Sequence, residues 1–503
     1  MSFDKGWWCA MEQSVCVLKF GGTSVGNGER IRRVASIIAD TLHDSAVPFP
    51  VVVVSAMSGV TDQLLRIAGH ACSGEDVACD KELLALRQKH IEAAAQVTPA
   101  GDERTRLLHF LEDAFSHLIE DVHTLRRVAT TGDMVHLRTA AVASWGERLS
   151  ILLVSAASRM HGIQAEPVSK EVIITSHPPH DPSQPFGVVE GADPLNEETR
   201  ANAQALIYPL VQAGIVPIAA GFIGRTVTGF VTTLGRNGSD YSATTIGAAL
   251  DCVDISIYTD VDGVLTADPR LVANTRLLPH LSYAEAARLS WFGAKVLHPR
   301  TLIPIAWRNI PVRVRNSFHP HIRGTVIGPV DHTTSGAGAI STRRKLALIT
   351  VESTDLFGAP ENAGQVFVLA ARAGAAPVAI CSSSGHHLSF LVDEKSVDSV
   401  VKLLHHDMDA TLWRVSVRRG LAACACIGSG FTSDPMSSAR AITALASERI
   451  PVISQGASEQ GITLIVEDRS SERALRCLHR DLIAPVIPLV RHPAPRKQER
   501  RQA

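Results

Sequence analysis

Short apolar runs alternate with amphipathic stretches over the first two thirds of the chain. The apolar runs read VCVLKF, VVVVSA, IVPIAAGFI, ISIYTD and VRVRN. Helical patterns separate them at residues 29–42, 81–118, 137–160 and 282–292. Strands and helices that alternate in this way pack as a mainly parallel sheet between helices. The pattern therefore predicts an α/β domain with buried central strands.

A different pattern follows after residue 343, because the sequence repeats with a period of 74 residues. Residues 377–394 align without gaps on residues 451–468, and LHHD at 404–407 then falls on LHRD at 478–481. Each copy is predicted to read strand, helix, strand, strand, helix, strand. Neither copy carries an obvious catalytic cluster, so the duplication indicates a regulatory pair. Duplication for stability alone is the alternative.

Length and composition set the domain boundaries that we expect. A chain of 503 residues is too long for one compact core. The segment at residues 177–198 holds five prolines and is predicted to be a surface loop. The predicted boundaries are 14–330 for the first domain, 331–343 for a linker, 344–418 and 419–487 for the two repeats, and 488–503 for a disordered basic tail.

Charge and cysteine usage exclude several classes of protein. The formal net charge is -1, which supplies no long-range field for nucleic acid or a membrane surface. No apolar run approaches the roughly 20 residues that span a bilayer. Nine cysteines are scattered without regular spacing, and the first residues lack a secretory signal pattern. We therefore expect a cytoplasmic protein with neither nucleic-acid nor membrane partners.

The stretch KFGGTS, residues 19–24, follows the first apolar run. Its glycines allow a sharp turn close to a ligand, and Lys19 adds a positive charge. The lysine precedes the glycines, so the stretch is not the usual P-loop, and the spacing of a dinucleotide fingerprint is absent. On its own, the stretch is either a site for a phosphorylated ligand or a tight turn.

Three later stretches also carry candidate chemistry. In TTLGRNGSDYSA, Arg236 suits a carboxylate, whereas Ser239 or Asp240 could simply cap the following helix. YTDVDGVLTADPR could organise Mg²⁺ or a ribose, although its DG and DP dipeptides are also ordinary turn chemistry. FGAKVLHPRTL places Lys295 in an apolar context that calls for an anionic partner. Neither a nucleophilic triad nor a zinc spacing is recognisable.

Taken in order, these motifs resemble the aspartate kinases, within the amino-acid kinase superfamily. KFGGTSVGN, SAMSGVTDQLL, WGERLS, GFIG, TTLGRNGSDYSA, YTDVDGVLTADPR and FGAKVLHPRTL carry the resemblance. The duplicated region resembles the family's tandem ACT domains, which have a ferredoxin-like βαββαβ fold. The resemblance implies phosphoryl transfer from ATP to the side-chain carboxylate of L-aspartate, giving 4-phospho-L-aspartate for lysine, threonine and methionine biosynthesis.

The resemblance also implies roles for individual residues. The catalytic residues would be Lys19, Asp240 and Lys295. The aspartate-binding residues would be Ser55, Thr61, Glu147, Phe222, Arg236 and Ser239, with Arg236 on the α-carboxylate and Glu147 on the α-ammonium. The nucleotide-binding residues would be Lys19, Gly21, Gly22, Ser24, Thr259, Asp260, Arg270, Lys295 and Val296. Mg²⁺ would accompany ATP as the phosphoryl donor.

The implied reaction agrees with the lack of a recognisable catalytic base. A carboxylate with a reference pKa of about 4 is already ionised at neutral pH, so the nucleophile needs no deprotonation. The site must instead offset the repulsion between two anions. Two alternatives stay open, namely a superfamily kinase for another small carboxylate and a catalytically inactive ACT protein that senses an amino acid.

The resemblance further implies an amino-acid effector, a homodimer or larger homo-oligomer formed through the ACT domains, and no fused second enzyme. The chain departs from the family at Leu265, where many relatives carry tyrosine. It departs again at Glu361 and Asn362, where relatives commonly place proline and glycine. We therefore expect changed adenine contacts and a changed effector pocket.

Overall fold

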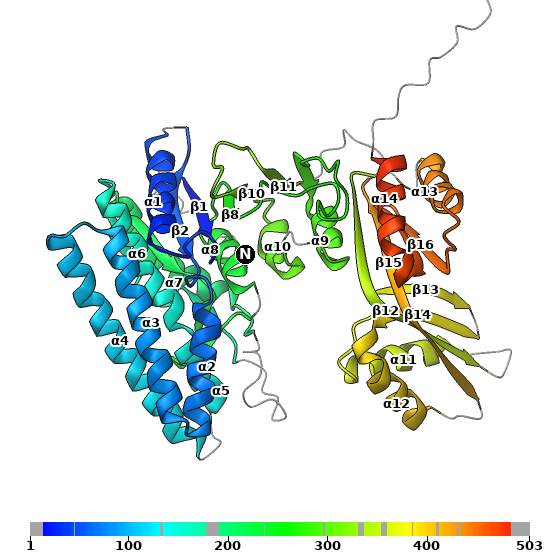
Figure 1. The fold of residues 1–503 in the computed structure, drawn as a ribbon, viewed down its shortest axis with the longest axis horizontal. Coiled ribbons are helices and arrows are strands. Elements are labelled where there is room, and N and C mark those ends of the chain that lie inside the picture. Colours follow the sequence, from blue (N-terminus) through cyan, green and yellow to red (C-terminus); the bar gives the residue numbers. More distant parts are fainter. Residues whose placement is uncertain are drawn as a thin grey trace, which may run out of the picture. The chain divides into compact units, whose positions relative to one another are not determined.

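The computed structural model divides the chain into two compact units, which are coloured along the sequence in Figure 1. The first comprises Met1–Leu265 and Arg276–Thr333, and the second comprises Thr266–Thr275 and Thr334–Ala503. The described residues are 14–44, 46–130, 134–177, 191–235, 237–294, 297–329, 337–353, 360–384, 386–408, 412–429, 431 and 434–483. The predicted basic tail, most of the predicted loop at 177–198, and Glu361 and Asn362 as effector-pocket side chains lie outside what is described.

The first unit is built on an eight-stranded sheet in the order β3-β5-β2-β1-β8-β10-β11-β9. Its strands are β1 (Val15–Phe20), β2 (Phe49–Val54), β3 (Ala165–Pro167), β5 (Val216–Ala220), β8 (Ile255–Thr259), β9 (His280–Ser282), β10 (Val312–Asn316) and β11 (Thr325–Gly328). Every neighbouring pair is parallel except β10 with β11. A small second sheet joins β4 (Ile173–Thr175), β6 (Ile223–Thr226) and β7 (Val231–Thr233). The predicted parallel α/β domain is confirmed.

Ten helices in the described part of the first unit surround this sheet. They are α1 (Gly28–His43), α2 (Val60–Ser73), α3 (Asp76–Val97), α4 (Asp102–Ala129), α5 (Val135–Ala143), α6 (Trp145–Met160), α7 (Asn196–Gln212), α8 (Gly238–Ala249), α9 (Tyr283–Trp291) and α10 (Pro299–Ala306). The single helix predicted over residues 81–118 is wrong. The chain breaks between α3 and α4, where Pro99 and Gly101 interrupt the helical pattern.

Alternation along β1 decides which side chains reach which face of the sheet. Cys16, Leu18 and Phe20 pack into the apolar cluster formed with α1 to α6. Side chains alternate across a strand, so Lys19 projects toward the opposite face, where α8 contacts β1. The alternation therefore directs a lysine at the carboxyl end of β1 toward α8.

Parallel pairing also gathers the sequence motifs at one edge of the sheet. Strands β1, β2, β5 and β8 run in the same direction, so their carboxyl ends share one edge. The turns that follow these four strands carry KFGGTS, SAMSGVT, GFIG and YTDVDG. Ligands of open α/β sheets bind at the carboxyl ends of the strands. The fold alone therefore assigns the candidate site to this edge.

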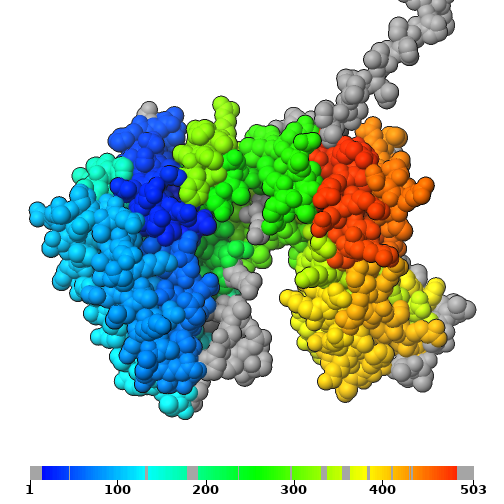
Figure 2. Space-filling model, viewed as in Figure 1, coloured from blue at the N-terminus to red at the C-terminus, as the bar shows by residue number. Residues whose placement is uncertain are grey.

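The second unit contains a six-stranded antiparallel sheet in the order β13-β14-β12-β15-β17-β16. Its elements are β12 (Ala339–Ser353), α11 (Pro360–Arg372), β13 (Ala379–Ser384), β14 (His387–Asp393), α12 (Val397–Asp407), β15 (Trp413–Ile427), α13 (Pro435–Ser447), β16 (Ser454–Ser458), β17 (Gly461–Glu467) and α14 (Ser471–Leu482). β14 and β17 start 74 residues apart, as do α12 and α14, which confirms the repeat. Figure 2 shows the yellow first repeat and the orange-to-red second repeat as one continuous surface.

The two repeats share their central strands. The later part of β12 pairs with the start of β15 in the first repeat. The earlier part, residues 339–343, pairs with residues 423–427 and fills the fourth strand position of the second repeat. These five residues lie within the stretch that the sequence assigns to a linker, and the predicted boundaries at 344–418 and 419–487 stay predictions. Cys424 and Cys426 are fully buried in β15, as expected for core residues.

Residues Val135–Met160 are long and apolar enough to cross a membrane by length and composition, yet 83% of the tested window is buried inside the protein. Among the described residues, this is the one helical stretch that passes the test. α5 and α6 lie within the stretch, and Leu149, Leu153 and Val154 of α6 contribute to the apolar cluster beneath the sheet. Burial of this kind is what a core helix shows.

Candidate active site

A cavity of about 520 Å³ opens at the carboxyl edge of the first unit's sheet. Eight of the residues predicted for the site line this one cavity. These residues are Lys19, Gly22, Ser55, Thr61, Glu147, Phe222, Ser239 and Asp240. They come from the ends of β1, β2 and β5 and from the starts of α2, α6 and α8.

An ion pair in the cavity joins Lys19 to Asp240. The lysine Nζ lies 2.5 Å from Oδ1 of Asp240, and the two side chains are 8% and 19% exposed. Asp240 lies in the first turn of α8, after Asn237, whose backbone adopts the left-handed conformation at φ 57°. The capping alternative for Ser239 or Asp240 is wrong, because the N-cap is Asn237 and no described side chain makes a cap hydrogen bond there.

The glycine turn packs tightly against its neighbours. Gly21 donates its N–H to the carbonyl of Tyr258 over 3.2 Å. A Cβ added to Gly22 would lie 3.0 Å from the carbonyl oxygen of Ala56, so a side chain there requires movement of the backbone. Ser24 is 2% exposed and its hydroxyl donates to Ser317 over 2.8 Å. Gly21 and Ser24 lie outside the lining of the cavity, and Ser24 instead ties the turn to the end of β10.

A hydrogen-bonded link fixes the glycine turn relative to the loop after β2. The hydroxyl of Ser58 donates to the carbonyl of Gly22 over 2.8 Å, and both residues line the cavity. Lys89 of α3 donates in turn to the carbonyl of Ser58 over 2.6 Å. Burial lowers the pKa of Lys89 below its ordinary value. These contacts set the spacing of the two loops that bound the cavity.

Glu147, near the start of α6, is the most deeply buried acid in the cavity. It is 2% exposed, and its Oε1 accepts the N–H of Ala56 over 3.1 Å. Its Oε2 has no hydrogen-bond partner among the described residues. Burial raises the pKa of Glu147 to about 8, although the Ala56 N–H and the charge of Lys19 act in the opposite direction. An unpaired buried carboxylate oxygen suits a cationic ligand.

Replacing Glu147 by glutamine is expected to stabilise the ligand-free protein at high pH. The folded-state pKa of about 8 exceeds the ordinary value of 4.5, so between these two values the unfolded chain releases this proton while the folded chain keeps it, and the stability of the glutamic-acid protein falls as the pH rises from 4.5 to 8. The gain from glutamine should therefore be near zero at pH 4.5, should grow by roughly 1.4 kcal/mol per pH unit, and should level off above pH 8 at no more than about 5 kcal/mol. Thermal unfolding of both proteins between pH 4.5 and pH 9 measures it. A gain that does not depend on pH would contradict the assigned pKa.

Phe222 occupies a strained backbone position beside the cavity. Its φ is +65°, which is uncommon for a residue with a side chain, and its N–H donates to the hydroxyl of Ser242 over 2.8 Å. A Cβ added to Gly238 would lie 2.7 Å from the Phe222 ring. The glycine at the start of α8 therefore leaves room for the ring that closes this side of the cavity.

Some of the residues predicted to bind the nucleotide lie outside the lining of the cavity. Thr259 ends β8, and its hydroxyl donates to Asp260 over 3.1 Å. Neither residue lines the cavity. Two residues further on, Asp262 accepts from Asn316 over 2.7 Å and contacts His319 at 3.1 Å. The hydrogen bond from Asn316, followed by that from His319, holds the pKa of Asp262 below its usual range.

Arg270 belongs to the second unit, where its guanidinium makes a two-pronged contact with Asp268 at 2.9 and 2.6 Å. Arg270 is not among the residues that line the cavity, and its predicted role stays a prediction. Arg236, Lys295 and Val296 lie outside the described residues. Their predicted roles stay predictions.

Other residues, which were not predicted from the sequence, also line the cavity. They are Ala56, Met57, Ser58, Gly59, Asp62, Leu65, Gly235, Asn237 and Gly238. All of them lie in SAMSGVTDQLL or GRNGSD, so these two motifs could have predicted them. Among the described residues, no group of three histidine, cysteine, aspartate or glutamate side chains could hold a metal ion.

Comparison with known proteins agrees with this geometry. Residues 14–316 match the amino acid kinase family, and residues 425–482 match an ACT domain. Aspartokinase 1, chloroplastic, of Arabidopsis thaliana is 32% identical over 481 residues, which cover 92% of this chain and 79% of that protein. The chain belongs to the aspartokinase family. Its kinase and ACT regions therefore have the fold that the motifs predicted.

Other relatives of this aspartokinase chain are longer. Bifunctional aspartokinase/homoserine dehydrogenase 2, chloroplastic, of Arabidopsis thaliana is 36% identical over 92% of this chain. The chain spans about half the length of that relative. Among solved structures, Escherichia coli aspartokinase III in complex with aspartate and ADP superposes with a TM-score of 0.74 at 28% identity, covering 93% of this chain and all of that one. The same enzyme with lysine and aspartate gives a TM-score of 0.71.

Proposed function

We propose that the protein transfers the terminal phosphoryl group of ATP to the side-chain carboxylate of L-aspartate. One observation carries the proposal: a single cavity presents the Lys19 ammonium and the buried, unpaired Oε2 of Glu147. A cation suits the phosphoryl group and the attacking carboxylate, and an anion suits the α-ammonium of an amino acid. The product would be 4-phospho-L-aspartate.

The reaction needs positioning and charge neutralisation rather than a base. An oxygen of the aspartate side chain attacks the γ-phosphorus, the bond to the bridging oxygen of ADP breaks, and ADP leaves with the electron pair. Lys19 offsets the repulsion between the two anions, and Asp240 holds the lysine in place through their 2.5 Å contact. Ser55, Thr61 and Ser239 offer hydroxyl groups to the carboxylates of the substrate. Arg236 is assigned to the α-carboxylate from the sequence motif.

Mg²⁺ is proposed to enter with ATP. A hard cation of this kind binds through phosphate oxygens and one or two protein carboxylates, often retaining several waters. Asp240 fits that demand, because it is the partly exposed carboxylate that faces the cavity beside Lys19. When bound, Mg²⁺ would supply positive charge to the phosphate oxygens.

Regulation, assembly and location are also proposals. The ACT region supports an amino-acid effector, and the related Escherichia coli enzyme has a structure in complex with lysine. Assembly into a homodimer or larger oligomer through ACT sheets stays a prediction. The plant relatives are named as chloroplastic proteins, and the cytoplasmic location expected for this chain is a prediction as well.

A substrate panel tests the proposed function. The full chain is incubated with MgATP, hydroxylamine and L-aspartate, L-glutamate or N-acetyl-L-glutamate, because hydroxylamine traps acyl phosphates as hydroxamates. We expect hydroxamate from aspartate alone. Hydroxamate only from another acid would favour a different member of the superfamily. ATP binding without any hydroxamate, together with amino-acid binding, would favour an inactive sensor.

A further inference from the structure

A ten-residue segment, Thr266–Thr275, leaves the first unit and becomes part of the second. The residues that flank it belong to the first unit, where Leu265 and Leu277 form an isolated antiparallel bridge. The N–H of Leu278 also donates to the carbonyl of Val264 over 2.8 Å. We call Thr266–Thr275 the docked segment. It follows the loop after β8 that carries Asp260.

Apolar side chains of the docked segment lie inside the core of the second repeat. Ala267 and Val272 are each 7% exposed. They belong to one cluster with residues of β15, β17, α13 and α14, and Leu271 packs against that cluster. Burial in a shared core ties the segment to the second repeat through the hydrophobic effect.

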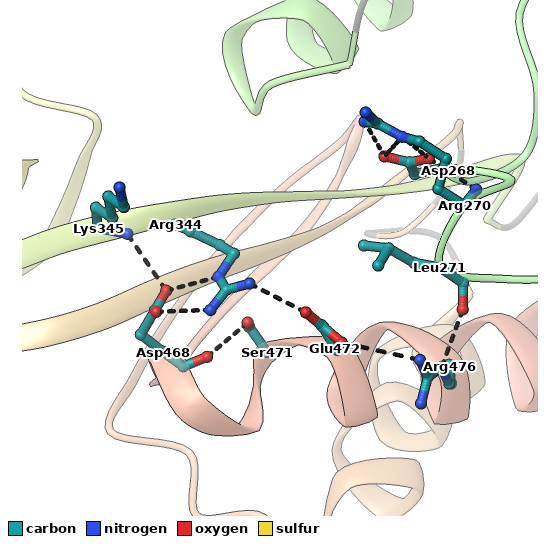
Figure 3. Close-up of polar contacts among 9 residues, drawn as sticks. All are labelled: Asp268, Arg270, Leu271, Arg344, Lys345, Asp468, Ser471, Glu472 and Arg476. Carbon is teal, nitrogen blue, oxygen red and sulfur yellow. Dashed lines mark hydrogen bonds and ion pairs between the residues drawn. The ribbon is translucent and has the colours of Figure 1, made fainter.

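Three polar contacts fix the docked segment in register. Thr266 Oγ1 lies 2.9 Å from Nε2 of His479, and both side chains are 4% exposed. The carbonyl of Thr266 accepts the N–H of Ile340 in β12 over 2.8 Å. Arg476 of α14 donates its Nε–H to the carbonyl of Leu271 over 2.9 Å (Figure 3). The Thr266–His479 hydrogen bond is buried, and removing one partner of such a bond is costly.

Arg476 is itself held by a chain of charges along α14. Glu472 lies 3.8 Å from Arg476 and 3.1 Å from Arg344 of β12. Arg344 makes a two-pronged contact with Asp468 at 3.1 and 2.9 Å, as Figure 3 shows. The guanidinium that contacts Leu271 is therefore directed by neighbours within the second repeat.

The first repeat shows what the same positions look like without a docked segment. His405 and Lys402 lie 74 residues before His479 and Arg476, at the aligned positions of α12. Both His405 and Lys402 are exposed. His479 is buried in the second repeat, where Thr266 contacts it. The contacts therefore belong to docking rather than to the repeat fold itself.

The docked segment lies close in sequence to residues that are predicted to bind the nucleotide, and it contains one of them. Thr266 follows Asp260 by six residues, and Asp262 between them is fixed by Asn316 and His319. The segment itself carries Arg270, which the motif assigns to the nucleotide and which Asp268 orients. Movement of the segment would therefore disturb residues on both sides of Leu265.

From this geometry we propose that His479 and Arg476 of the second repeat are positioning residues for the nucleotide. They hold the docked segment, and the segment restrains the loop after β8 together with Arg270. The inference rests on the proposed function, since it assigns the restrained residues to ATP. The second repeat thereby takes part in ATP binding even when no effector is bound.

Matched variants of the full chain test the proposal. His479→Leu removes the bond to Thr266, whereas His479→Gln retains an amide that can replace Nε2. Thr266→Val removes the same bond from the other side with little change of volume. His405→Leu, at the aligned exposed position, is the control. For each protein we would measure the KM for ATP and for aspartate, the Kd of MgATP by calorimetry, and the thermal midpoint.

We expect His479→Leu and Thr266→Val each to raise the KM for ATP and the Kd of MgATP roughly 5- to 10-fold, with the KM for aspartate changed less than about 2-fold. The double variant should be no worse than the worse single one, because both remove one bond. His479→Gln and His405→Leu should resemble the wild type. Equal effects on both substrates, or unchanged MgATP binding in a folded His479→Leu protein, would overturn the proposal. A wild-type chain inactive on aspartate would refute the proposed function, while its Kd for MgATP would still test the positioning role.

Discussion

Replacing Lys19 by alanine is expected to lower kcat by roughly 100-fold or more, because one preorganised charge aimed at the transferring group contributes about that much. The Lys19 side chain is 8% exposed, lies at the carboxyl end of β1 and contacts Asp240 at 2.5 Å inside the cavity. Its charge would be needed most when phosphoryl oxygens and the attacking carboxylate approach. Steady-state rates of hydroxamate formation at saturating ATP and aspartate measure the effect.

Two controls separate chemistry from folding in this experiment. Lys170→Ala removes an exposed lysine of the same unit and should leave kcat unchanged. Lys19→Ala also leaves Asp240 without its cation, so the double variant Lys19→Ala/Asp240→Asn shows how much of the loss comes from the orphaned carboxylate. Near-normal turnover in a folded Lys19→Ala protein would refute the role given to Lys19.

Replacing Glu147 by glutamine is expected to raise the KM for aspartate by roughly 10- to 100-fold, since a hydrogen bond to a charged group contributes about 1.5–3 kcal/mol. The amide keeps the shape of the side chain, and it can still accept from Ala56 through its oxygen. It lacks the negative charge that the α-ammonium would meet. The KM for ATP should change much less, because Glu147 is assigned to the amino acid alone.

The pH dependence of the KM for aspartate is a second, independent test of the role of Glu147. The pKa of Glu147 in the empty site is about 8, so the carboxyl is increasingly protonated as the pH falls below that value. Aspartate must then displace a proton in order to bind, and the KM of the wild type should rise between pH 8.5 and pH 6.5. The glutamine variant should show a flatter profile over the same range. Parallel profiles in the two proteins would exclude Glu147 as the partner of the ammonium.

Much of the catalytic half could be predicted from the sequence, since strand order and motif order determine where the turns meet. The apolar runs became β1, β2, β5, β8 and β10, and their carboxyl ends gathered the motifs. Alternation along β1 sufficed to direct Lys19 away from the apolar cluster. The burial of Glu147 could not be predicted from the sequence, because this burial depends on how α6 packs against the loop after β2.

The remaining differences come from tertiary contacts that no local pattern encodes. The motif YTDVDGVLTADPR reads as one loop, yet the structure divides it after Leu265 and buries Ala267 in the second repeat. The stretch before the first repeat contains glycines typical of a linker, although residues 339–343 pair with β15. Strand pairing across about 80 residues and burial in a distant core depend on the whole fold.

The most direct test of the proposed reaction follows the oxygen that joins aspartate to phosphorus. L-Aspartate labelled with ¹⁸O in its side-chain carboxylate is incubated with the protein, MgATP and hydroxylamine, and the products are analysed by mass spectrometry. If the carboxylate attacks the γ-phosphorus, the β-hydroxamate of aspartate forms and the released phosphate carries one ¹⁸O atom. Release of ADP with unlabelled phosphate and no β-hydroxamate would contradict the proposed function.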